Sequence, residues 1–284
     1  MFDVYSSCRQ VRSDGITVNV ADHGPTDGEA VLMLHGFPDS ARLWRSQVPA
    51  LVEAGYRVLA PDLRGFGRSQ IDVSVPQCGM ASLCADALAV LDDAGVDRAH
   101  VVGHDWGAAV SWMLALSAPD RFRSLTALSV GHPSAFQRAG VAQREKSWYM
   151  LLFQFEGVAE TALSADDWRW LRRWGAGCGE ADNWIADLSR PGALEAALAI
   201  YRANSRPESF IAPPRDHPPV EVPVMGVWST EDPALTERQM VESERYVSGP
   251  WRYERLEGVG HWVPVEAPEE LNALLLDWLG RQVA

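Results

Sequence analysis

Asp105 stands in a short motif whose residue types suit nucleophilic chemistry. An apolar run at Ala99–Val102 leads into Gly-His-Asp-Trp-Gly at residues 103–107, and a segment with helical periodicity follows. Glycines on both sides of a central residue relieve the crowding of a sharp turn from strand to helix, and the start of a helix favours a nearby negative charge. The motif therefore predicts one of two roles for Asp105: a nucleophilic carboxylate held out at the end of a strand, or a cap of the following helix.

A histidine and two further carboxylates lie late in the chain. His261 stands in Gly-Val-Gly-His-Trp at residues 258–262, while Glu231 and Asp232 are adjacent to each other after the strand predicted at Pro223–Trp228. A neutral imidazole that is oriented by an acid can deprotonate water as a general base. The glycine-rich loop favours His261 as that base among the seven histidines, and the residues leave both acidic neighbours open as its partner.

The elements that must position these side chains alternate between strand and helix. Strands are predicted at Val31–Leu34, Arg57–Ala60, Ala99–Val102, Ser124–Val130, Pro223–Trp228 and Trp251–Leu256, helices around Thr236–Tyr246 and from Pro268, and an opening hairpin within Val11–Val20. Short apolar runs rich in β-branched residues, each followed by turn residues and a helical segment, are typical of a parallel sheet covered on both faces. The sequence predicts an α/β fold with a mostly parallel central sheet flanked by helices.

This alternation stops between His132 and Pro219. The segment has a helical pattern, is rich in tryptophan, and ends in a cluster of prolines that cannot form regular ladders. We predict a helical subdomain at residues 132–219, called the cap segment below, inserted between a first part of the core at 1–131 and a second part at 220–284.

Composition narrows the classes of partner. The chain has 284 residues and a formal net charge of -13, which disfavours binding to nucleic acid or to anionic membrane surfaces. The first residues lack the basic and apolar stretch of a secretory signal, and no apolar run is long enough to span a bilayer. The four cysteines form no CxxC pair, so we expect buried or half-buried free thiols, no metal site and a cytoplasmic protein. Monomer and homodimer are both open.

Over essentially its whole length the chain resembles the α/β-hydrolase superfamily, and within it the branch of epoxide hydrolases and haloalkane dehalogenases. The resemblance rests on the motif at 103–107, on His-Gly-Phe-Pro at 35–38, and on the loops that carry Asp232 and His261. It implies that Asp105 attacks an sp³ carbon to form an alkyl–enzyme ester, which argues against esterase or peptidase activity. Asp232 is then the acid and His261 the base that activates water.

The same resemblance assigns the loop at 35–38. Its implied oxyanion hole consists of the backbone N–H groups of Phe37 and Trp106, which stabilise the oxyanion formed when water attacks the ester. His35 is expected to be structural. Phe37, Trp106 and Trp148 are expected to line the substrate pocket, and the reaction needs no cofactor and no metal.

Two tyrosines of the cap segment separate the possible reactions. Residues 148–160, with Tyr149, and 199–204, with Tyr201, resemble the segments that carry the two proton-donating tyrosines of epoxide hydrolases. With an ordinary pKa of about 10, a tyrosine stays protonated at neutral pH and can protonate an epoxide oxygen. The alternative is that both are ordinary packing residues of amphipathic helices. The resemblance implies a hydrolase of ether bonds that converts small-molecule epoxides and water to vicinal diols.

Two other functions stay open from the sequence. A haloalkane dehalogenase with the same triad needs donors for a halide. The Trp106 indole would supply one and the tryptophan-rich cap segment another, although Phe37 occupies the loop position where some members carry Asn. Fluoroacetate-type dehalogenases usually have Arg where this chain has Trp106. A catalytically silent hydrolase fold used for binding would show loss of one of the reactive residues, and all five are present.

Overall fold

An eight-stranded sheet forms the centre of the computed structural model, which describes residues 2–282. The strands are β1 Cys8–Ser13, β2 Ile16–His23, β3 Ala30–Leu34, β4 Arg57–Pro61, β5 Ala99–His104, β6 Phe122–Leu128, β7 Val224–Ser229 and β8 Trp251–Leu256. Their order across the sheet is β1-β2-β4-β3-β5-β6-β7-β8. The pairs β1–β2 and β2–β4 are antiparallel and the others parallel. The predicted α/β class with a mostly parallel sheet is confirmed.

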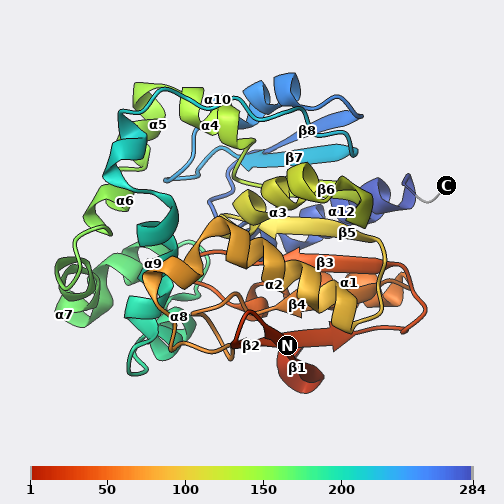
Figure 1. Cartoon of the computed structure of the whole chain (residues 1–284), viewed down its shortest axis with the longest axis horizontal. Helices are drawn as coiled ribbons and strands as arrows, with labels where there is room; N and C mark the ends of the chain where they lie inside the picture. The colour runs from red at the N-terminus through yellow and green to blue at the C-terminus, as the bar shows by residue number, and fades with distance from the viewer. Residues whose placement is uncertain (1, 283–284) are drawn as a thin grey trace.

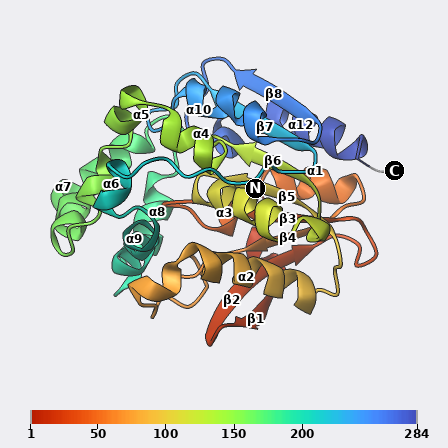
Figure 2. The same cartoon turned by 45° about the horizontal axis from the view of Figure 1, so that its top comes forward.

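Helices cover both faces of this sheet (Figures 1 and 2). The core helices are α1 Gln47–Glu53, α2 Met80–Asp93, α3 Trp106–Ser117, α10 Glu237–Val241, α11 Val263–Glu266 and α12 Pro268–Gly280. Alternate residues of β3 separate the two apolar layers: Leu32 packs in the cluster that includes α2 and α3, and Val31 in the cluster that includes α1 and α12. A strand buried on both faces in this way reads as a continuous apolar run, which is why β3 is visible in the sequence.

The opening hairpin follows from its turn residues. Asp14 and Gly15 both have positive φ, 46° and 79°, as a two-residue turn between antiparallel strands requires. The hairpin prediction is confirmed. One cysteine prediction is wrong: Cys8 is exposed, because β1 is an edge strand whose first residues face outward, whereas Cys78 and Cys84 are buried. All four cysteines are free.

The cap segment contributes six helices between β6 and β7: α4 Pro133–Arg138, α5 Val141–Lys146, α6 Tyr149–Leu152, α7 Val158–Trp174, α8 Ala181–Leu188 and α9 Ala193–Asn204. Backbone angles within α7 leave the helical region at residues 165–168, so α7 consists of two stretches joined at a kink. Figure 1 shows helices α5 to α9 beside the end of the sheet at which β5 ends. The cap segment therefore adjoins the turn that carries Asp105.

The chain returns from the cap segment to the sheet through residues 205–223. This stretch contains one short 3₁₀ turn at Pro207–Phe210 and an isolated bridge from Val220 to Val247, as the proline cluster predicts. Within residues 2–282, no helix is both long and apolar enough to cross a membrane.

Candidate active site

Asp105 occupies a strained turn between β5 and α3. Its φ is 53° and its ψ -120°; it stands at the N-cap position of α3, but its side chain makes no capping bond to that helix and is left for another role. A Cβ at Gly103 would lie 2.3 Å from the Gly107 carbonyl oxygen, and one at Gly107 would lie 1.9 Å from the Leu34 carbonyl oxygen. Both glycines are thus required by close backbone contact. A strained backbone of this kind is typical of functional sites.

The loop at 35–38 holds one oxygen of the Asp105 carboxylate. The Phe37 backbone N–H donates to Oδ1 over 2.9 Å. Gly36 permits this approach, because a Cβ there would lie 2.3 Å from the same oxygen. Burial raises the pKa of Asp105, but His261 and the Trp106 backbone N–H outweigh burial and leave that pKa below its usual value. Asp105 is therefore an ionised carboxylate with one oxygen bound by a backbone amide.

His35 has the structural position expected of it. It is fully buried, its Nε2 accepts from the Leu63 backbone N–H over 2.9 Å, and its Nδ1 lies 2.9 Å from the Gly36 carbonyl oxygen. Since Nε2 accepts, Nδ1 carries the proton and donates. The ring thus fixes the loop that carries Phe37.

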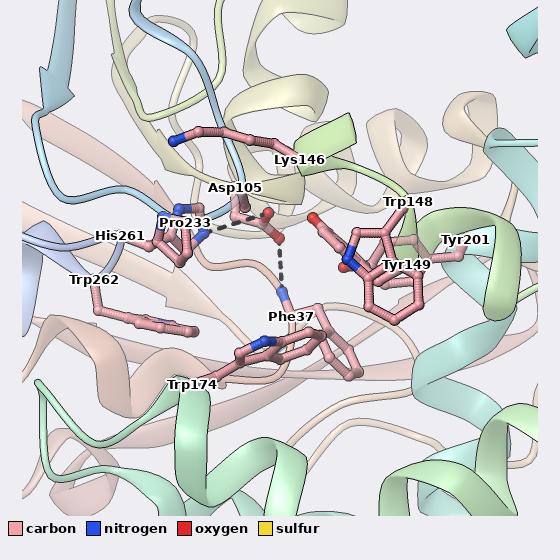
Figure 3. Close-up of a pocket in the computed structure, with 11 residues that line it drawn as sticks. Phe37, Asp105, Lys146, Trp148, Tyr149, Trp174, Tyr201, Pro233, His261 and Trp262 are labelled. Carbon is pink, nitrogen blue, oxygen red and sulfur yellow. Dashed lines mark hydrogen bonds and ion pairs between the residues drawn. The ribbon is translucent and has the colours of Figure 1, made fainter. Parts of the chain in front are cut away.

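His261 lies between the two carboxylates (Figure 3). Its Nδ1 is 2.8 Å from Asp232 Oδ2, and its Nε2 is 3.6 Å from Asp105 Oδ2. Asp232 Oδ1 accepts the backbone N–H groups of Ala234 and Leu235, each over 2.8 Å, which leaves Oδ2 for the imidazole. Glu231 is exposed. Of the two acidic neighbours left open by the sequence, Asp232 is the one that contacts His261.

The charge of His261 depends on these neighbours. Burial lowers the pKa of its imidazole, but Asp232 and Asp105 together outweigh burial and raise that pKa to about 10. At neutral pH the ring is therefore an imidazolium beside the ionised Asp105 carboxylate. Loss of the charge on Asp105 would lower the pKa of His261, because one of the two stabilising anions would be gone.

His104 holds the loop that carries His261, a role for which the sequence contained no separate signal. His104 Nε2 lies 2.9 Å from the His261 carbonyl oxygen, which also accepts from the Ser129 hydroxyl over 3.3 Å. Burial, followed by the neighbouring His261, lowers the pKa of His104 to about 4, so its ring is neutral. Because a carbonyl only accepts, Nε2 carries the proton. The motif residue next to Asp105 thus fixes the loop of His261.

The two tyrosines approach from the cap segment. Tyr149 begins α6 and Tyr201 lies in α9, with ring centroids 6.2 Å apart. Figure 3 shows both hydroxyl oxygens pointing toward the Asp105 carboxylate, on the side away from His261. Burial, followed by the Asp105 charge, raises the pKa of both phenols well above 10. Both groups are therefore protonated donors at neutral pH.

Comparison with known proteins shows the family to which this chain belongs. A family model described as the alpha/beta hydrolase fold matches residues 29–268. The chain belongs to the α/β-hydrolase family. It is 33% identical to "Epoxide hydrolase A" of Mycobacterium tuberculosis, over 95% of this chain and 96% of that protein. It is 32% identical to "AB hydrolase superfamily protein YfhM" of Bacillus subtilis, over 97% and 98% of the two chains.

Solved structures of this α/β-hydrolase family superpose closely on the chain. The crystal structure of epoxide hydrolase A from Mycobacterium thermoresistibile matches with a TM-score of 0.84 and 31% identity, over 96% of this chain and 98% of that one. The Bacillus megaterium epoxide hydrolase in complex with an inhibitor matches with a TM-score of 0.86 and 25% identity, over 96% and 100%.

The pocket of this hydrolase lies between core and cap segment. It encloses about 500 Å³, part of it open to solvent, and its lining residues are Phe37, Asp105, Lys146, Trp148, Tyr149, Trp174, Tyr201, Pro233, Ala234, His261 and Trp262. Phe37 and Trp148 stand in the wall. Trp106, which the sequence also placed in the wall, lies behind it, because its ring packs edge-on against Tyr201 with centroids 5.0 Å apart.

Lys146 is the pocket residue that sequence reasoning missed most clearly. It is the only lysine in the chain, since the remaining basic residues are arginines. A lysine that occurs only once could have marked a special position, but the sequence does not show that the last residue of α5 lies opposite the loop at 232–235. Trp174, Pro233 and Trp262 were missed for the same reason.

Proposed function

We propose that this chain opens small-molecule epoxides to vicinal diols with water, through an ester formed on Asp105. The observation that carries the proposal is the position of the two tyrosine hydroxyls opposite the Asp105 carboxylate (Figure 3). A nucleophile on one side of the pocket and two protonated donors on the other suit a ring in which one carbon is attacked while the oxygen leaves. The named relatives, which are epoxide hydrolases, support the same reaction.

In the first step, Asp105 Oδ2 attacks a ring carbon. Oδ1 stays bound to the Phe37 N–H and becomes the carbonyl oxygen of the ester. The carbon–oxygen bond of the ring breaks, and Tyr149 or Tyr201 transfers its proton to the departing oxygen. Proton transfer of this kind contributes about 10²- to 10⁴-fold to a rate.

In the second step, water attacks the ester carbonyl. Esterification removes the charge of Asp105, so the pKa of His261 falls from its resting value. The imidazolium then releases its proton and the tyrosinate takes one up, which leaves both groups neutral. Neutral His261, held by Asp232, then takes a proton from water while the Phe37 and Trp106 amides stabilise the oxyanion. Collapse breaks the bond between the ester carbonyl carbon and the alkoxy oxygen, and the departing alkoxide takes the proton of the new carboxylic acid. The diol leaves, with a carboxylate restored at Asp105 beside a protonated His261.

The cap segment at 132–219 is part of this proposal as the lid that supplies the proton donors, with the core at 1–131 and 220–284 supplying the triad. A haloalkane dehalogenase has less support, because the Trp106 indole ring packs against Tyr201 instead of lining the pocket. A cytoplasmic location is supported by the four free thiols. Either a monomer or a homodimer is compatible with a pocket formed by one chain.

The His261→Gln variant tests the assignment of the two steps. Incubation with a styrene-type epoxide should leave the ester on Asp105, because alkylation does not need the base, and intact mass should show the adduct. The wild-type protein should form diol from the same epoxide. Normal turnover by the variant would contradict the role of His261, and no diol from any epoxide of a panel would contradict the proposed function.

A further inference from the structure

Two side chains of α5 form hydrogen bonds with the loop of the core that carries Asp232. The Lys146 ammonium donates to the carbonyl oxygen of Asp232, and also to that of Leu235 over 3.3 Å. Figure 3 shows the Lys146 side chain extended across the pocket, with its ammonium on the side of Pro233 and His261. The only lysine of the chain thus binds the backbone on both sides of Pro233.

Gln143, one helical turn earlier on α5, binds the rest of the same loop. Its side chain is buried; Nε2 donates to the Ala234 carbonyl oxygen over 2.9 Å, and Oε1 accepts from the Thr236 backbone N–H and hydroxyl, each over 2.8 Å. Residues three apart lie on one face of a helix, so Gln143 and Lys146 present one polar edge to the loop. We call these two residues the α5 latch.

The conformation of the loop that carries Asp232 determines where the Asp232 carboxylate points. This loop, called the acid loop below, runs from the end of β7 at Ser229 to the start of α10 at Glu237. Within it, the N–H groups of Ala234 and Leu235 hold Asp232 Oδ1, and only then does Oδ2 meet His261 Nδ1. The carbonyl oxygens of these same two residues accept from the α5 latch. A shift of α5 would therefore change the orientation of the acid.

The α5 latch is joined just as closely to the first proton donor. Gln143 Nε2 also donates to the Ser147 hydroxyl over 2.7 Å, the Ser147 N–H donates to the Gln143 carbonyl over 2.9 Å, and Tyr149 follows two residues later. One short stretch of the cap segment thus contacts the acid loop with one end and supplies the Tyr149 hydroxyl to the pocket with the other.

An ammonium suits this contact better than a guanidinium. Its three donors diverge from a single compact charge and can bind two carbonyl oxygens of a tight loop, whereas the planar fork of arginine matches a carboxylate. The one departure from arginine in the chain falls where two backbone carbonyls are bound from a helix end.

We propose that Gln143 and Lys146 are positioning residues that couple the seating of the cap segment to the orientation of Asp232, and so to the base His261. The inference rests on the proposed function for its kinetic consequence but not for its structural one. With the cap segment seated, the acid loop is held and ester hydrolysis is fast. With α5 displaced, the loop is released and the ester persists.

The kinetic test is Lys146→Met, which keeps the apolar stem and removes the donors. The matched control is Arg144→Met, a change from cation to Met on the same helix at an exposed side chain that forms no ion pair or side-chain hydrogen bond within residues 2–282. In single-turnover measurements, Lys146→Met should slow ester hydrolysis about tenfold, as expected for loss of hydrogen bonds to a charged group, and ester formation much less. Equal hydrolysis rates in Lys146→Met and Arg144→Met would overturn the proposal, as would an equal fall in both steps.

A double-mutant comparison shows whether Lys146 acts through Asp232. In an Asp232→Asn background, Lys146→Met should slow hydrolysis no further, because the coupled partner has already been lost. A further tenfold fall in the hydrolysis rate in the Asp232→Asn background would contradict the proposal that Lys146 acts through Asp232.

Hydrogen exchange tests the latch without any substrate. Backbone amides in the peptide that spans residues 232–236 should exchange about tenfold faster in Lys146→Met, and in Gln143→Met, than in Arg144→Met, because opening of the loop no longer breaks the latch bonds. Unchanged exchange would overturn the proposal. Faster exchange together with no diol from any epoxide would contradict the proposed function but would still support the role of Gln143 and Lys146 in holding the loop.

Discussion

The edge of the core and the cap segment meet at one pocket but hold their reactive groups by different means. In the core, hydrogen bonds between side chains and backbone fix the site: the Phe37 N–H binds Asp105, two loop N–H groups bind Asp232, and the His104 ring binds the His261 carbonyl. Hydrogen bonds of this kind are directional, so they tolerate little displacement.

In the cap segment, aromatic packing holds the tyrosines. Phe153 is fully buried, and its ring centroid lies 5.4 Å from that of Tyr149 and 4.9 Å from that of Tyr201. Tyr201 also packs edge-on against Phe37 and Trp106. Ring packing of this kind can shift by small amounts at low cost. The comparison indicates that directional hydrogen bonds position the triad, whereas the position of the two tyrosine hydroxyls depends on aromatic packing in the cap segment.

The largest expected effect comes from removing both cap donors. Tyr149→Phe combined with Tyr201→Phe should lower the rate of epoxide opening by about 10³- to 10⁴-fold, because no phenol remains to protonate the leaving oxygen. Stopped-flow or product assays with a chosen epoxide measure this. Tyr253→Phe is the matched control, since its hydroxyl bonds to Glu237 away from the pocket and its loss should leave the rate unchanged. A double variant as active as this control would remove the cap segment from the chemistry.

A smaller effect is expected from disturbing the core contact. Gly36→Ala places a Cβ 2.3 Å from Asp105 Oδ1, so the loop must move and the Phe37 N–H must leave its oxygen. We expect a loss of about 10²-fold in turnover, the cost of one oxyanion-hole donor. Gly280→Ala, where a Cβ meets open space, is the control. Equal activity in the two variants would show that the core tolerates displacement after all.

Loosening the aromatic packing of the cap segment should affect ring opening and ester hydrolysis differently. Phe153→Ala should cost about 3–5 kcal/mol in the free energy of unfolding, as for a fully buried Phe. It should slow ring opening about tenfold by misplacing the tyrosines, yet leave hydrolysis of a preformed ester unchanged, because the triad is held by hydrogen bonds of the core and by the α5 latch, neither of which includes Phe153. Denaturant unfolding and single-turnover rates measure the three quantities. A matching fall in ester hydrolysis would show that the packing of Phe153 also supports the triad.

A further prediction concerns a pH dependence of stability that belongs to the core alone. The pKa of His261 is raised from 6.5 to about 10 in the folded protein. Its stabilising contribution is therefore complete below pH 6.5 and is lost as the pH rises toward 10. The difference in free energy of unfolding between wild type and His261→Gln should decline across this window, whereas the difference for Tyr149→Phe should stay flat. A flat difference for His261→Gln would contradict the buried imidazolium.

The same contrast explains what could be predicted from the sequence. The strand before Asp105, its flanking glycines and the glycine-rich loop of His261 are local patterns, so the core half of the site could be located before the structure was known. The contacts of Lys146 and His104 depend on how distant segments pack. The same is true of the Trp106 ring, which lies behind Tyr201 instead of in the pocket wall. Glu231 and Asp232 are equivalent in sequence, and only the loop turn distinguishes them.

Oxygen transfer in a single turnover tests the central claim most directly, that Asp105 forms the covalent bond. Excess protein is mixed with epoxide in oxygen-18 water, and both the diol and the peptide that contains Asp105 are examined by mass spectrometry. Attack by Asp105 predicts an unlabelled diol and one heavy oxygen in the Asp105 carboxylate, because the carboxylate gives its own oxygen to the product. A labelled diol with an unlabelled Asp105 peptide would show direct attack by water and would contradict the account.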